Sequence, residues 1–114
     1  MTVIEYLEAT YKEGERYHVR PGVVCSDGFR VSIQGGTDSH YCSPRESCNQ
    51  YDEVELGFPS EKVAEWMEWC ENADNPTDTV YGYVPIEVVE NVVASHGGID
   101  FVKMAESEAD RLTE

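Results

Sequence analysis

Basic residues are scarce in this chain. It has eight Lys and Arg against 23 Asp and Glu over 114 residues, which gives a formal net charge of −15 at pH 7. A surface this acidic repels phosphate groups, so we expect no direct binding of nucleic acid. Such a charge also opposes compaction by self-repulsion. It therefore serves either to keep the protein soluble or to attract a basic partner.

Long apolar runs and an export signal are also missing. No stretch approaches the roughly 20 apolar residues that cross a bilayer. The chain begins Met1-Thr2-Val3-Ile4-Glu5, with an acid where a signal peptide carries bases. We expect a cytoplasmic protein without membrane association, whose four cysteines are reduced thiols.

Motifs for metal binding and catalysis are absent as well. Cys42 and Cys48 are separated by five residues, whereas zinc-binding cysteines are usually two to four apart, and His40 does not complete a second pair. No lysine follows Gly35-Gly36 as it would in a phosphate loop. We therefore expect no metal, no cofactor and no catalytic residues, and a small metalloprotein or Cys/His enzyme is the least favoured class.

The residues that are present predict one α+β domain over residues 1–114, with an antiparallel sheet of three to four strands packed against helices. Thr2 and Glu5 form a capping box at the start of a helix that Gly14 ends, and Ser26-Asp27-Gly28 turns a hairpin running from Tyr17 to Gln34. The expected order continues with a short helix at 43–46, a strand at 53–58, a helix at 60–71, a strand at 79–84, a helix from 85 that Gly97-Gly98 ends, and a helix from 100 to 112.

The predicted helix over 60–71 separates apolar from acidic residues. At 100° per residue, its apolar face holds Val63, Trp66, Met67 and Cys70, and we expect Trp66 and Met67 to be buried. The opposite face carries three acids at i, i+4 and i+7, which repel one another. These are Glu61, Glu65 and Glu68, with Trp69 on the flank of the helix.

Acidic residues also crowd the segments around this helix. Residues 46–114 hold 17 acids and three bases, whereas residues 1–45 hold six acids and five bases. Glu53 and Glu55 lie on the expected solvent face of the preceding strand, about 6.6 Å apart. We therefore expect a partner-binding patch formed or bordered by Glu53, Glu55, Glu61, Glu65 and Glu68, with Trp69 at its rim. The competing interpretation is an ordinary solvated helix face.

Three stretches resemble short acidic proteins of bacteriophages and prophages, a group that includes anti-CRISPR proteins. They are His40-Tyr41-Cys42-Ser43-Pro44-Arg45, Val54-Glu55-Leu56-Gly57-Phe58-Pro59-Ser60 and Thr79-Val80-Tyr81-Gly82-Tyr83-Val84-Pro85. The resemblance covers about half of the chain and includes no catalytic motif. It implies an inhibitor in the host cytoplasm that binds a basic, nucleic-acid-contacting surface of a defence complex.

Two functions therefore stand as expectations. The first is an anti-CRISPR-type inhibitor whose partner is a Cas protein or another nucleic-acid-binding host protein. The second is a non-catalytic phage accessory or structural protein whose acidity serves solubility and which oligomerises. The sequence leaves the partner, the inhibited step and the oligomeric state open.

Overall fold

Four antiparallel strands, paired in the order β1-β2-β3-β4, form the framework of the protein. The computed structural model describes residues 1–11, 20–36, 41–44 and 50–113, with side chains described up to residue 107. The strands are β1 (Val23–Val24), β2 (Arg30–Gln34), β3 (Glu53–Gly57) and β4 (Val80–Pro85). The helices are α1 (Val3–Ala9), the 3₁₀ helix η1 (Ala64–Trp69), α2 (Ile86–Ser95) and α3 (Phe101–Thr113). The predicted α+β class is confirmed.

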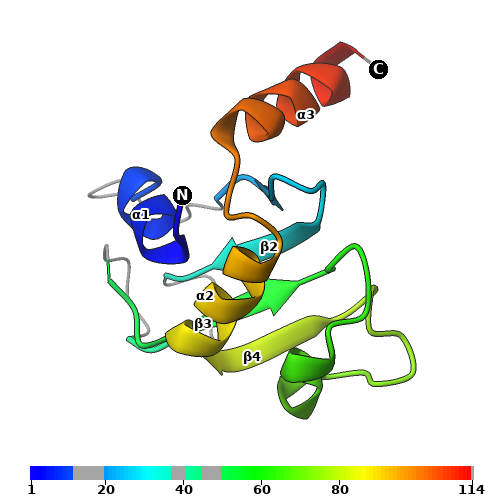
Figure 1. Cartoon of the computed structure of the whole chain (residues 1–114). Coiled ribbons are helices and arrows are strands. Elements are labelled where there is room, and N and C mark those ends of the chain that lie inside the picture. The colour runs from blue at the N-terminus through cyan, green and yellow to red at the C-terminus, as the bar shows by residue number, and fades with distance from the viewer. Residues whose placement is uncertain (12–19, 37–40, 45–49, 114) are drawn as a thin grey trace.

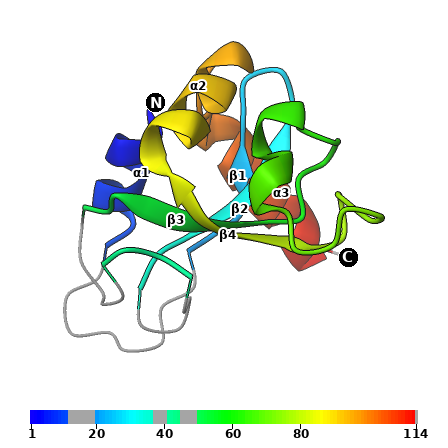
Figure 2. The same ribbon diagram turned by 90° about the horizontal axis from the view of Figure 1, so that it is seen from below.

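The core lies between one face of the sheet and three of the helices. Strand alternation buries Val54 and Leu56 of β3, which pair with Val84 of β4 and Ile33 of β2. Helices α1 and α2 and the helix η1 lie on this side of the sheet (Figures 1 and 2). Helix α3 packs against β1 and extends away from the sheet (Figure 1). Apolar burial on one sheet face therefore holds the domain together.

Several local signals produce the elements they predict. Thr2 Oγ1 accepts a hydrogen bond from the Glu5 N–H, and the Glu5 carboxylate accepts one from the Thr2 N–H, so the capping box is confirmed. The turn at Ser26–Gly28 joins β1 to β2, and α2 ends before Gly97-Gly98, as expected. Asp100 Oδ1 accepts from the Lys103 N–H at the beginning of α3.

Other expectations fall partly outside the described residues. Helix α1 ends earlier than we expected, at Ala9 with Thr10 as its C-cap. Gly14, the expected end, and Tyr17, the expected start of the hairpin, lie outside the described residues. Ser43, the expected start of a short helix, pairs instead with Glu53 as an isolated bridge. Arg45 and Glu46 lie outside the described residues.

The α-helix predicted over 60–71 is wrong in type and extent, because only Ala64–Trp69 is helical and it is a 3₁₀ helix. Ser60 is hydrogen bonded to Arg30 through its backbone N–H and its Oγ. Cys70 bridges Tyr81 at the other end. A 3₁₀ helix rises about 2.0 Å per residue against 1.5 Å for an α-helix, so the same residues reach farther between these two anchored ends.

The period of three also changes which residues face the core. Val63 and Trp66 are buried, and Trp69 packs against the core although we expected it on the flank. The burial of Trp66 is confirmed, but Met67 is only half-buried. Trp66 contacts the rings of Phe29 and Tyr81 with centroid distances of 6.0 and 6.3 Å. One indole therefore joins η1 to the hairpin and to β4.

Glu90 of α2 holds the first turn of α1 in place. Its carboxylate accepts hydrogen bonds from the Val3 N–H at 2.6 Å and the Ile4 N–H at 3.4 Å. Helix N-termini have unpaired N–H groups and a partial positive charge, so a carboxylate is a favourable partner there. Glu90 thus links residues 87 positions apart in the chain.

Replacing Glu90 with alanine should lower the free energy of unfolding by about 1.5–3 kcal/mol, because two N–H groups lose a charged acceptor. Urea denaturation followed by tryptophan fluorescence measures this loss. Glu87→Ala is the matched control, since Glu87 is exposed on the same helix and should cost less than about 1 kcal/mol. Equal losses for the two variants would contradict the role of Glu90.

Candidate functional site

The segment between β3 and β4 carries an exposed array of carboxylates. We call residues 58–79 the acidic connection. Its acidic side chains are all exposed: Glu61, Glu65, Glu68, Glu71, Asp74 and Asp78. Lys62 is the single base within it. The connection therefore contributes a net charge of −5 from six acids and one base.

The described lysines and arginines do not neutralise these carboxylates. Within the part of the chain that the structure describes, none of the six forms an ion pair with a lysine or arginine. Glu65 and Glu68 are one 3₁₀ turn apart, so they lie on the same side of η1 with about 6 Å of rise between them. Their repulsion is therefore retained in the folded protein.

The five acids, which we expected on the solvent faces of a strand and the helix after it, are not equally exposed. Glu61, Glu65 and Glu68 are exposed, but Glu53 and Glu55 are half-buried on β3, an interior strand. Tyr81 of β4 pairs with Leu56 of β3 on one edge and with Cys70 on the other. Strand β4 therefore separates β3 from the end of η1, as Figure 1 also shows.

The regular stripe that we expected at i, i+4 and i+7 is also absent. Glu61 precedes η1, so only Glu65 and Glu68 share a helix face. Trp69 is half-buried and packs against the core. The acidic surface extends instead toward Glu71, Asp74 and Asp78, which the patch predicted from the sequence did not include.

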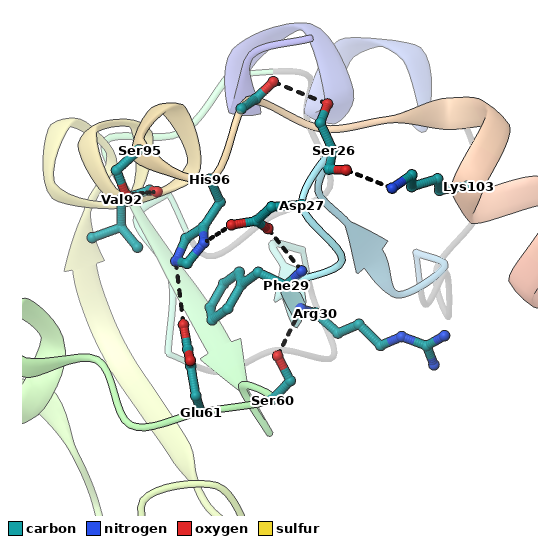
Figure 3. Close-up of polar contacts among 11 residues, drawn as sticks. Ser26, Asp27, Phe29, Arg30, Ser60, Glu61, Val92, Ser95, His96 and Lys103 are labelled. Atoms are coloured by element: carbon teal, nitrogen blue, oxygen red, sulfur yellow. Dashed lines mark hydrogen bonds and ion pairs between the residues drawn. The ribbon is translucent and has the colours of Figure 1, made fainter.

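A second feature, the cluster of Asp27, Glu61 and His96, was not found from the sequence. His96 Nδ1 lies 2.6 Å from Asp27 Oδ2, and His96 Nε2 lies 3.7 Å from Glu61 Oε1 (Figure 3). The imidazole also stacks on Phe29, with ring centroids 4.1 Å apart and planes inclined by 5°. Three segments therefore meet at one side chain: the β1–β2 turn, the end of α2 and the acidic connection.

Backbone contacts fix the position of this cluster. The Ser26 N–H donates to the Gly98 carbonyl at 3.0 Å, and the Asp27 N–H donates to the His96 carbonyl at 3.3 Å. Ser26 Oγ donates to the Gly97 carbonyl, and Lys103 Nζ donates to the Ser26 carbonyl (Figure 3). The β1–β2 turn is thus bound to the C-terminal end of α2, where unpaired carbonyls need donors.

The electrostatics of the cluster favour an ionised Asp27. The Phe29 N–H donates to Asp27 Oδ1 at 3.0 Å. This hydrogen bond, together with the one from His96, holds the pKa of Asp27 below its ordinary value of 3.8. A cleft of about 260 Å³ lies beside the cluster, lined by Asp27, Gly28, Phe29, Ser60, Glu61 and His96. Its walls include the carboxylates of Asp27 and Glu61 and can hold a cationic group.

The cysteines do not form a reactive or metal-binding site among the described residues. Cys25, Cys42 and Cys70 are free thiols, and Cys48 and His40 lie outside the described residues. Burial raises the pKa of Cys25 to about 11, with a further contribution from the charge of Asp27, so this thiol stays protonated at neutral pH. No group of three His, Cys, Asp or Glu side chains in the described ranges could hold a metal ion. Asp27 and Glu61 approach different nitrogens of His96 and do not converge on one point.

Comparison with known proteins gives no family assignment. No protein-family model matches the chain, and neither the curated proteins nor the solved structures contain a significant match. Among the described residues, no helix has the length and apolar character needed to cross a membrane.

Gly97→Ala should lower the free energy of unfolding by about 1–3 kcal/mol. Gly97 has a φ of +89°, and a Cβ there would lie 2.9 Å from the Cβ of Ser26. Gly22→Ala is the control, because no atom lies within 4 Å of its Cβ position and its φ is not positive. Thermal or urea unfolding compares the two. A loss at Gly97 no larger than at Gly22 would show that the turn does not depend on this close approach.

Asp27→Asn should lower stability at pH 7, and its effect should fade in acid. Because the folded-state pKa of Asp27 is depressed, the ionised carboxylate stabilises the fold above its unfolded-state pKa. That stabilisation is lost as the pH falls below about 4. Urea unfolding of both proteins between pH 7 and pH 2.5 measures the difference. A difference that is unchanged across this range would exclude a contribution from the charge of Asp27.

Proposed function

We propose that this protein binds a basic protein surface through the acidic connection and competes there with nucleic acid. The observation that carries the proposal is the set of six exposed carboxylates without a lysine or arginine partner in the described part of the chain. A groove lined with Lys and Arg would relieve the repulsion among them. It would also accelerate association through electrostatic steering.

The occupied groove would be one that normally holds DNA or RNA. The acids on η1 are held at fixed positions by a helix whose two ends are anchored, which resembles a fixed row of phosphates more than a flexible acidic tail does. An inhibitor of a host defence complex uses a surface of this kind, and a CRISPR effector is the first partner to test. In this proposal the chain acts by occupying a site and has no catalytic residue.

A second proposal is an oligomerising accessory protein. The observation that favours it is the exposure of Phe101 and Val102, with exposed fractions of 40% and 68%, at the beginning of α3. Apolar side chains of this size often mark a contact surface when they cluster. Sedimentation of the protein at micromolar concentration distinguishes the two: a monomer argues against this second proposal.

The double variant Glu65→Lys/Glu68→Lys should slow association with a basic effector by about tenfold at 50 mM salt. The expected loss becomes smaller at 500 mM salt, because screening removes the steering. The measurement is the rate at which the protein prevents a purified CRISPR effector from binding its target DNA. Stability should be unchanged or slightly higher, because the two introduced lysines repel each other as the two glutamates did but are attracted by the other acidic side chains of the acidic connection.

The matched control is Glu8→Lys/Glu87→Lys. It changes the net charge by the same amount at exposed positions outside the acidic connection. It should slow association less than threefold if position matters more than total charge. Equal effects of the two double variants would show that net charge alone is responsible. Unchanged association of the Glu65/Glu68 variant at low salt would place the contact elsewhere. Trp69→Ala is less informative, because Trp69 also packs against the core.

A further inference from the structure

The side chain of His96 is held so that each ring nitrogen faces a different carboxylate. The residue caps the C-terminus of α2, and its ring stacks on Phe29, which is itself buried. With 18% of its side chain exposed, His96 is largely enclosed, whereas Asp27 and Glu61 are 51% and 62% exposed. The ring is therefore the fixed element of the cluster, and the carboxylates are the ones that can move.

The two contacts differ in length. Asp27 lies at hydrogen-bonding distance from Nδ1, at 2.6 Å, but Glu61 lies 3.7 Å from Nε2, beyond the length of a hydrogen bond. A neutral imidazole carries one ring proton, and an imidazolium carries two. If the single proton is on Nδ1, where Asp27 accepts it, the Nε2 lone pair faces the Glu61 carboxylate and repels it. A second proton on Nε2 turns this contact into attraction.

We propose that protonation of His96 controls the position of Glu61, an arrangement we call the clasp. The protonated imidazole holds the Glu61 carboxylate, and with it the start of the acidic connection. The neutral imidazole releases this carboxylate. This proposal rests on the proposed function in one respect: the segment it would regulate is the one assigned to partner binding. Release leaves Glu61 available to a cationic group of the partner, beside the 260 Å³ cleft. Protonation withdraws that carboxylate from the binding surface.

Other charged groups near the ring do not replace these partners. Lys103 of α3 donates a hydrogen bond from Nζ to the Ser26 carbonyl. The N-terminal ammonium of Met1 donates to the Ile99 carbonyl. Arg30 contacts Ser60 through its backbone. Among the described residues, the groups that contact the ring nitrogens are therefore Asp27 and Glu61. A change in the charge of the imidazole therefore changes its electrostatic interaction with both carboxylates.

The experiment is a titration of the free protein from pH 5 to 8.5, the range in which histidine side chains change charge. Carboxyl ¹³C shifts are recorded for Glu61 and Asp27 together with the His96 ring signals. We expect the Glu61 carboxyl carbon to shift in step with protonation of the His96 ring, as the Asp27 carbon does. Glu65, exposed on η1 and without a histidine contact in the described structure, is the internal reference and should show no such step.

His96→Gln should abolish the pH-dependent change in the Glu61 carboxyl shift over this range. Glu61→Gln should leave the corresponding change at Asp27 in place. If His96→Gln does not fold, the comparison of the Glu61 and Glu65 carboxyl shifts in the wild-type protein still tests whether Glu61 responds to protonation of His96. A step at Asp27 without one at Glu61 would overturn the clasp. Because the titration uses no partner, such a result would leave the proposed binding of a basic surface intact. Failure of the DNA-competition assay would in turn leave the clasp intact.

Discussion

The docking of the β1–β2 turn on the end of α2 determines how most of the molecule is assembled. Gly97 and Gly98, both with positive φ, end α2 and turn the chain toward Ile99, which pairs with Cys25. Asp100 then donates its N–H to the Val24 carbonyl, and α3 begins directly afterwards. Because positive φ is readily accessible only to glycine, two residues without side chains fix the relative positions of the hairpin, α2 and α3.

Charge and burial are separated in this fold. The core cluster is apolar, and the carboxylates of the acidic connection lie outside it at the margin of β4. Hydrophobic burial scales with area and does not depend on the charge at the surface. The domain can therefore tolerate strong self-repulsion as long as that repulsion acts between exposed groups in water, where it is weak. An acidic array at this margin is compatible with a stable core.

Local sequence signals predicted the elements whose causes are local. Three of these signals depend only on residues a few positions away in the sequence. They are the capping box of Thr2 and Glu5, the Asp27-Gly28 turn and the end of α2 at Gly97-Gly98. The 3₁₀ helix was not predicted, because its period depends on Ser60 being bound to Arg30 and Cys70 to Tyr81. The contact of Asp27 with His96 spans 69 residues, and no local pattern encodes it. A turn and a helix end could each be recognised, but their docking is a tertiary event.

The anchoring on either side of η1 also bears on binding. Ser60 is tied to the beginning of β2, and the Glu71 N–H donates to the Val80 carbonyl at the beginning of β4. Glu65 and Glu68 thus lie on a segment fixed at both ends, so less conformational entropy is lost when a partner engages them than with a flexible tail. At the first of these ends Glu61 follows Ser60 and faces His96. In the proposed clasp, a change in the charge of this imidazole acts on the Glu61 carboxylate beside the anchored Ser60, while Glu65 and Glu68 keep their positions because their segment is fixed at both ends.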